Sequence, residues 1–291
     1  THRLSSAASD VYKRQPHHPT LPDPHETQMR QLYHGSEFFD DVNRLEPLPK
    51  EEVIQARLTE MAFFRKMGVY AKVDRVEVKQ RQGKIISTKW IDTNKGTKDS
   101  PNYRSRLVGR EIKKDKIVRN DLYAATPPLE VIKLLIAKCA MGQKSSRPLR
   151  IATVDVRRAY FYARAQRPIY VEIPAEDWKA GDEGKIARLE MSLYGTRDAA
   201  TNWARAVEEA LIGIGFKRGI ASTCNYRHHA RSVDLTVQGD DFITVGAAED
   251  LEWSVRGTEK CFDIKTEMLG PEPGMKQEVG FLSRRIAWTT K

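Results

Sequence analysis

The sequence is poor in cysteine and lacks any long apolar run. Its 291 residues contain three cysteines, far apart and without C-x-x-C spacing, which argues against a disulfide framework and a zinc site. No stretch approaches the roughly 18 apolar residues of a membrane span, and no signal segment opens the chain. These absences predict an intracellular protein that is neither secreted nor embedded in a membrane.

Negative charge is also in deficit. Lysine and arginine number 49 against 39 aspartates and glutamates, which gives a net charge of +10 and a pI near 9.4. Such an excess attracts polyanions, and nucleic acid is the commonest polyanion inside cells. Many basic proteins bind no nucleic acid, so charge alone is a weak indicator. With 40% hydrophobic residues, the chain can build a core for one large or two ordinary domains.

The beginning of the chain gives little sign of structure. Residues 1–15 are rich in serine and alanine without periodicity and are interpreted as non-native sequence ahead of the gene. His and Pro clusters follow in residues 16–30, so we expect a disordered lead-in over residues 1–46. Apolar residues at helical spacing then predict a helix over residues 51–67.

Strand-like segments come next. Residues 73–78 (VDRVEV) and 85–91 (IISTKWI) flank a Gln82-Gly83 turn and are rich in β-branched residues. In residues 103–110 (YRSRLVGR), strand alternation would place Arg104 and Arg106 on one face. That face is either a basic binding surface or the charged edge of a solvated strand.

The second half alternates helices and strands. Thr126-Pro127-Pro128 suits a helix start, and an apolar stripe follows it as far as Gly142. Further on, the predicted elements are a strand at 149–156, a helix at 199–214, and strands at 234–237 and 242–245. Intermixed elements without a repeat predict an α+β fold, a sheet packed on helices.

Three aspartates are candidates for chemistry. Asp155 ends an apolar strand, where a carboxylate needs a compensating cation or donor. Asp240 and Asp241 follow Gly239 between two strands, a composition typical of a tight hairpin turn. Neighbouring strand residues point to opposite sides, so we expect Asp240, in preference to Asp241, to share a face with Asp155.

Converging carboxylates repel each other unless a divalent cation neutralises them, and oxygen ligands favour Mg²⁺. Two such ions could promote phosphoryl transfer from a triphosphate to a hydroxyl. Each motif also has an ordinary explanation, since Gly-Asp-Asp is a common turn and a lone Asp often caps a helix. Together the motifs are more informative.

The order of motifs resembles the copia-type reverse transcriptase domain over about residues 50–288. The matching segments are residues 106–110 (RLVGR), 123–137 (YAATPPLEVIKLLIA), 153–161 (TVDVRRAYF), 169–174 (IYVEIP, similar to VYMxxP), 193–203 (LYGTRDAATNW, similar to LYGLKQAPRxW), 237–242 (VQGDDF, at the place of YVDD) and 281–282 (FL, similar to FLG). The specific part is the Leu-Tyr-Gly…Trp segment between the two aspartate motifs.

This resemblance implies a right-hand polymerase fold. Residues 47–148 would form a fingers-like region, 149–260 a palm with an antiparallel sheet carrying the carboxylates, and 261–291 the end of the palm and start of the connection, without RNase H. It implies an RNA-directed DNA polymerase that adds deoxynucleoside triphosphates to a primer on an RNA or DNA template, in the cytoplasm, in virus-like particles or in the nucleus. Its cofactor would be two Mg²⁺ ions, with Mn²⁺ as a substitute.

The resemblance also assigns residues. Asp155 and Asp240 would bind the metal ions and Asp241 would support them. Tyr160 would lie under the incoming sugar and exclude a 2′-hydroxyl, unless it is simply a core aromatic. The remaining nucleotide-binding candidates are Arg104, Arg106, Tyr194, Gly195 and Arg197. We expect Trp203 to be a core residue of its helix.

Several positions depart from the family pattern. Asp198 and Ala200 replace Gln and Pro, Gly239 replaces Val, and Ala125 replaces Pro. Asp198 places negative charge near a pocket for a polyanion, so one alternative is a decayed relic that binds nucleic acid without synthesis. Another is an RNA-dependent RNA polymerase, in which Gly-Asp-Asp is the commoner turn. The Leu-Tyr-Gly…Trp segment and Tyr160 argue against that second alternative.

Overall fold

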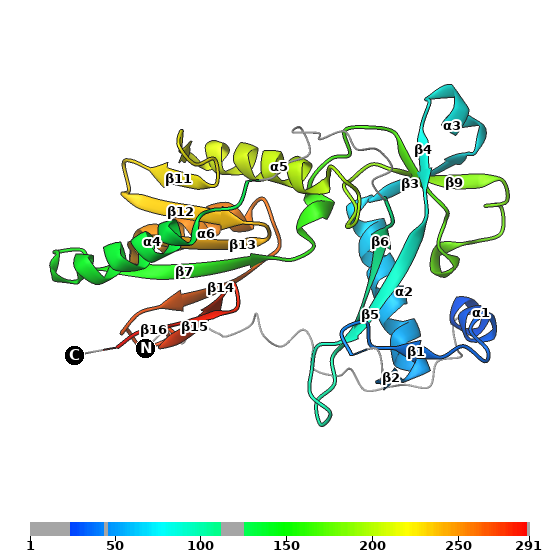
Figure 1. The fold of residues 1–291 in the computed structure, drawn as a ribbon, viewed down its shortest axis with the longest axis horizontal. Helices are drawn as coiled ribbons and strands as arrows, with labels where there is room; N and C mark the ends of the chain where they lie inside the picture. Colours follow the sequence, from blue (N-terminus) through cyan, green and yellow to red (C-terminus); the bar gives the residue numbers. More distant parts are fainter. Residues whose placement is uncertain (1–23, 44–45, 112–124, 290–291) are drawn as a thin grey trace, which may run out of the picture.

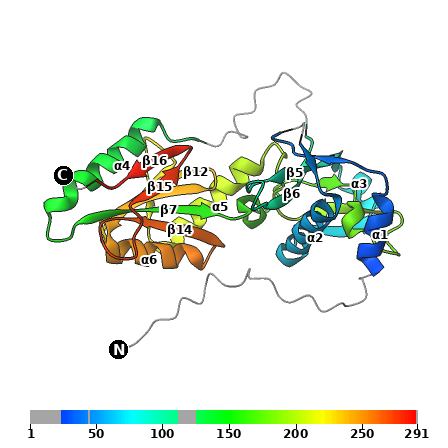
Figure 2. The same cartoon turned by 90° about the horizontal axis from the view of Figure 1, so that it is seen from below.

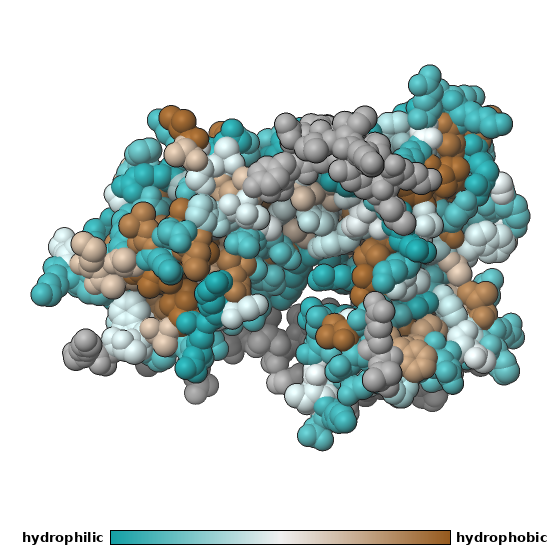
Figure 3. Space-filling view, in the orientation of Figure 1, coloured by the Kyte–Doolittle hydropathy of each residue, from teal (hydrophilic) through white to brown (hydrophobic). Residues whose placement is uncertain are grey.

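The structure of the chain is a computed structural model that describes residues 24–43, 46–111 and 125–289 (Figures 1 and 2). Two halves lie side by side along the longest axis, each built around its own sheet (Figure 1). The face drawn in Figure 3 is hollowed between them. Within the described residues, no helix is both long and apolar enough to cross a membrane.

One of the two halves of the molecule is built around a six-stranded antiparallel sheet. Its strands, in spatial order, are β10 (Lys217–Arg218), β11 (Asn225–His228), β12 (Val233–Gln238), β13 (Asp241–Ala247), β7 (Leu149–Val156) and β14 (Ile264–Leu269). Apolar side chains of β7 alternate between the two faces, because successive strand residues point to opposite sides. Ala152 and Val154 pack with helices α5 (Ala199–Ile214) and α6 (Ala248–Glu259), whereas Ile151 packs with α4 (Leu129–Met141).

The other half combines a sheet, a hairpin and a long helix. Its four-stranded sheet has the order β3 (Tyr70–Asp74), β9 (Lys185–Leu189), β8 (Ile169–Val171) and β4 (Lys84–Ile86). Strands β5 (Thr88–Asn94) and β6 (Tyr103–Gly109) form a hairpin that packs along α2 (Lys50–Met67). Met61 and Phe64 of α2 share a buried core with Leu107 of β6 and with Phe161 and Leu193 from the second half of the sequence.

Smaller elements complete the fold. They are α1 (Pro24–Leu32), β1 (Phe38–Phe39), β2 (Pro47–Leu48), α3 (Val76–Gln80), the 3-10 turns η2 (Gly142–Lys144), η3 (Ala159–Tyr162) and η4 (Ala175–Asp177), and the hairpin β15 (Glu278–Phe281) and β16 (Arg284–Ala287). The hairpin packs beside α4 through Val279 and Phe281.

Several sequence predictions are confirmed. The strand at 149–156 and the helix at 199–214 have the expected bounds, and the helix at 51–67 begins one residue earlier. On β6, Arg104 and Arg106 are exposed while Ser105 and Leu107 are buried, as alternation predicted. Trp203 is 2% exposed in the core.

Other expectations are wrong. Segment 73–78 does not continue as a strand, because α3 begins at Val76. The lead-in is not disordered throughout, since α1 packs against α2 and buries Met29. Residues 1–15, Tyr123 and Ala124 lie outside the described residues.

The predicted region boundaries also need correction. Strands β8 and β9, expected in the palm at 149–260, pair with β3 and β4 in the fingers-like sheet. Helix α4, expected in the fingers-like region at 47–148, packs on the six-stranded sheet. The chain therefore crosses between the halves more than once, and no single residue separates them.

Candidate active site

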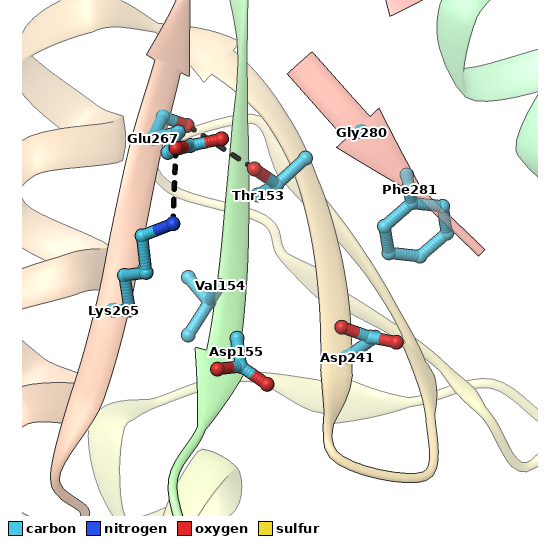
Figure 4. Close-up of a pocket in the computed structure, with 8 residues that line it drawn as sticks. All are labelled: Thr153, Val154, Asp155, Asp241, Lys265, Glu267, Gly280 and Phe281. Atoms are coloured by element: carbon cyan, nitrogen blue, oxygen red, sulfur yellow. Dashed lines mark hydrogen bonds and ion pairs between the residues drawn. The ribbon is translucent and has the colours of Figure 1, made fainter. Parts of the chain in front are cut away.

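Three aspartates gather at the end of the six-stranded sheet that faces the other half (Figure 1). Asp155 lies near the end of β7, and Asp241 is the first residue of the neighbouring strand β13, paired directly with it in the register. Figure 4 shows both side chains on the same side of the sheet. Asp240 belongs to the preceding turn, where its carbonyl accepts a hydrogen bond of 2.9 Å from the Val156 amide.

This register overturns one sequence expectation. Residues directly opposite each other on antiparallel strands share a face, so Asp241, not Asp240, is the carboxylate across from Asp155. The alternation argument failed because Gly239 and Asp240 form the turn and are not strand residues. Gly239 has φ of 63°, a left-handed conformation that glycine adopts easily.

The three carboxylates act on one another electrostatically. Burial raises the pKa of Asp155, and the charge of Asp240 raises it further. Burial likewise raises the pKa of Asp241 to about 6, with Asp240 and Asp155 adding to the effect. Lys265 lies opposite Asp155 on β14, but its ammonium pairs with Glu267 at 3.2 Å (Figure 4). Lys265, Arg157 and Arg106 lower the pKa of Asp155, but burial and the charge of Asp240 together outweigh them.

The donor chemistry suits a hard divalent cation. Carboxylate oxygens are the ligands that Mg²⁺ prefers, and a cation would relieve the repulsion that adds to the effect of burial on these pKa values. Among the residues that the structure describes, no group of three or more Asp, Glu, His or Cys side chains is arranged so that it could hold a metal ion.

Two tyrosines and an arginine stand beside the carboxylates. Tyr160 on η3 and Tyr194 have ring centroids 4.5 Å apart, and the guanidinium carbon of Arg106 lies 5.2 Å from the Tyr194 centroid. Burial raises the pKa of both tyrosines, that of Tyr194 to about 12, and the charge of Asp240 contributes to each shift. The Asp240 carboxylate is therefore close enough to Tyr160 and Tyr194 to act on both rings.

The remaining predicted nucleotide-binding residues take different places. Gly195 and Arg197 follow Tyr194 in a segment that lies against the end of β6, where Gly109 donates a 2.7 Å hydrogen bond to the Tyr194 carbonyl. Arg104 is exposed on the same face of β6 as Arg106. The structure brings together Asp155, Asp240, Asp241, Tyr160, Tyr194 and Arg106.

Sequence reasoning missed several neighbours. A cavity of about 170 Å³ adjoins Asp155 and Asp241 and is also lined by Lys265, Glu267 and Phe281 (Figure 4). The pairing of β14 with β7 could not be read from the sequence. Trp203 has a second role beyond the core, since its indole donates a 2.7 Å hydrogen bond to the Gly239 carbonyl and fixes the turn.

Comparisons with known proteins point to one family. A family model described as reverse transcriptase (RNA-dependent DNA polymerase) matches residues 70–266. The Retrovirus-related Pol polyprotein from transposon TNT 1-94 of Nicotiana tabacum is 24% identical over 228 residues, which is 76% of this chain and 16% of that protein. The Transposon Ty1-LR2 Gag-Pol polyprotein of Saccharomyces cerevisiae is 23% identical over 223 residues, 76% of this chain and 12% of that protein.

Among solved structures, apo telomerase from Candida tropicalis superposes with a TM-score of 0.52 at 11% identity, covering 89% of this chain and 56% of that one. This likeness concerns the fold alone. The fold is α+β with the fingers and palm of a right-hand polymerase, and the six-stranded sheet is the palm. Since the family model covers most of the chain, the protein belongs to the reverse transcriptase (RNA-dependent DNA polymerase) family, of the copia type found in the matching Pol polyproteins.

Proposed function

We propose that the chain is the polymerase domain of a copia-type retrotransposon reverse transcriptase, which extends a primer on an RNA or DNA template with deoxynucleoside triphosphates. The observation that carries this proposal is the pairing of Asp155 with Asp241, with Asp240 beside them, at the palm edge that faces Arg106 and Tyr194. The chain spans only 16% and 12% of the two polyproteins it matches, so the activity is proposed for this domain.

In this proposal Asp155 and Asp240 hold two Mg²⁺ ions, and Asp241 supports them from the opposite strand. The ions, when bound, would lower the pKa of the primer 3′-hydroxyl and stabilise the charge of the triphosphate and the departing pyrophosphate. Phosphoryl transfer needs little covalent help from the protein, so positioning and charge dominate. Mn²⁺ has the same ligand preference and would substitute.

The chain's own residues would orient the nucleotide. The exposed Arg106 guanidinium on β6 would attract the triphosphate from the fingers side. The Tyr160 ring, held against Tyr194, would support the sugar and leave no room for a 2′-hydroxyl. Gly195 and Arg197 would border the base and the template strand.

Primer extension by the wild-type chain and by aspartate variants tests the proposal. We expect Asp155→Asn and Asp240→Asn each to lower Mg²⁺-dependent extension at least about hundredfold, because a charged ligand is lost where charge develops. Asp241→Asn should cost less if its role is only supporting. Asp74→Asn, at an exposed end of β3, is the matched control and should extend normally.

The results would also separate the alternatives. Extension that survives both substitutions would remove the carboxylates from the mechanism. Incorporation of ribonucleotides in preference to deoxynucleotides would identify an RNA polymerase. Salt-sensitive binding of primer and template without any extension would identify a relic.

A further inference from the structure

An arginine that was not among the predicted site residues bridges two buried carboxylates beside the predicted site. Arg167 lies in the loop before β8, and its guanidinium donates bonds of 2.8 and 2.5 Å to the two carboxylate oxygens of Glu111. It also donates bonds of 3.0 and 2.8 Å to those of Asp198. Two bidentate pairs to one guanidinium form a rigid, directional junction.

The junction is buried on its acidic side. The Glu111 side chain is 1% exposed and that of Asp198 is 11% exposed, while Arg167 is 30% exposed. The Lys84 ammonium also donates a bond of 2.8 Å to Oε1 of Glu111. Burial alone would raise the pKa of Glu111, but the bonds from Arg167 and Lys84 outweigh it and lower the pKa to about 2. Two cations thus neutralise two carboxylates.

Glu111 connects this junction to the nucleotide-binding segment. Its carboxylate accepts a 2.9 Å bond from the Arg197 amide, and its own amide donates a bond of 3.4 Å to the Gly195 carbonyl. The segment and the end of β6 are so close that a Cβ on Gly195 would lie 2.0 Å from the Gly109 carbonyl oxygen. A shift of Glu111 would therefore move the backbone that carries Tyr194 and Arg197.

We propose that Arg167 is a positioning residue for the nucleotide pocket. Its guanidinium neutralises the carboxylates of both Asp198 and Glu111, and through Glu111 it fixes residues 194–197 against the fingers strand β6. The negative charge of Asp198, a departure from the family pattern, does not reach the pocket uncompensated, because Arg167 pairs with it. This inference rests on the proposed function, since it concerns the affinity for an anionic nucleotide.

Removal of Arg167 would have two effects. Glu111 and Asp198 would face each other without their shared cation, which is costly for buried carboxylates. The Glu111 carboxylate would then no longer be held under the Arg197 amide, and negative charge would lie close to the triphosphate. Both effects weaken nucleotide binding more than the chemical step.

The experiment compares Arg167→Met, Arg167→Lys, the double variant Arg167→Met/Asp198→Asn, and the control Arg75→Met. Arg75 also forms a bidentate pair with a carboxylate, that of Glu172, but on the exposed side of the fingers. Steady-state primer extension gives KM for the deoxynucleotide and kcat. Amide hydrogen exchange at Arg197 reports the Glu111 contact and does not depend on activity.

We expect Arg167→Met to raise KM about tenfold while kcat changes less than about threefold, as for loss of one compensating charge. The double variant should recover most of the increase in KM, and the KM of Arg167→Lys should lie between those of the wild type and Arg167→Met. Exchange at Arg197 should accelerate in both variants that carry Arg167→Met, because Glu111 loses the same two bonds in each. If Arg167→Met does not fold, the intermediate KM of Arg167→Lys carries the test.

An unchanged KM in both Arg167→Met and Arg167→Lys, equal to that of Arg75→Met, would overturn the inference. So would a KM that rises in Arg167→Met but is not recovered when Asp198 is neutralised. A wild-type chain that extends no primer, while Arg197 exchange still depends on Arg167, would refute the proposed function and leave the positioning contact supported.

Discussion

Tyr160 is the single residue whose proposed role is easiest to separate from a structural one. Its ring is half-buried and held 4.5 Å from Tyr194, on the side of Asp240. We predict that Tyr160→Ala raises ribonucleotide incorporation relative to deoxynucleotide incorporation by about a hundredfold, because a steric block of one hydroxyl is removed. Competitive incorporation from mixed nucleotides measures the ratio.

The control for this prediction keeps the ring. Tyr160→Phe should retain the selectivity of the wild type, since the steric block depends on the ring and not on the hydroxyl. If Tyr160→Ala instead lowers stability with no change in selectivity, the residue serves only the core, where it packs beside the cluster that includes Trp203.

For single residues, the sequence predicted the placements that depend only on local backbone geometry. Alternation placed Arg104 and Arg106 on one exposed face because β6 is a regular strand. The same rule failed for Asp240, since it does not hold inside a turn. The partner of Asp198 was beyond prediction, because Arg167 is 31 residues away in sequence and no short-range signal connects them.

The β12–β13 hairpin is the element that most directly controls the carboxylates. Gly239 in its turn has φ of 63°, so the Val common in the family at this position would be strained, since β-branched residues rarely adopt that conformation. We predict that Gly239→Val lowers the free energy of unfolding by about 1–3 kcal/mol. It should also lower primer extension, because the strained turn carries Asp240. Denaturant unfolding and extension assays measure the two effects.

Gly213 provides the matched control. It lies in helix α5, and a Cβ there would meet nothing within 4 Å. Gly213→Ala should therefore stabilise the protein by about 0.5–1 kcal/mol without affecting extension. A Gly239→Val variant as stable as the wild type would mean that the turn adopts another conformation.

Among the elements, those with clear periodicity were predicted well. Helix α5 begins and ends where its apolar spacing and Gly215 indicated, and the apolar strand β7 has its predicted bounds. Segment 73–78 was predicted as one strand from its β-branched composition, but β3 ends at Asp74 and α3 follows. Short apolar runs are compatible with either structure, so tertiary contacts decide between them.

On the scale of the whole molecule, motif order was more informative than any boundary drawn along the chain. The order of the aspartate and Leu-Tyr-Gly motifs predicted the polymerase fold, because it does not depend on where the chain crosses between halves. The places where the chain crosses between the halves depend on long-range strand pairings. One example is the pairing of β4 with β8, which helps to form the fingers sheet. Composition and local pattern contain no information about such pairs.

The net charge of +10 belongs to the molecule as a whole and predicts how the proposed template and primer would bind. Association of a basic protein with duplex releases counterions, so the logarithm of the binding constant should fall linearly with the logarithm of salt, by about 0.9 for each phosphate contacted. We predict a strong decrease between about 50 and 200 mM KCl, measured by fluorescence anisotropy with a labelled primer and template. Asp155→Asn should bind at least as tightly as the wild type with nearly the same slope, because it removes a negative charge from the site and no phosphate contact. An affinity that does not respond to salt would show that the basic surface is not the binding surface. A slope that changes in Asp155→Asn would mean that the carboxylates contribute to binding of the nucleic acid and not only to the chemical step.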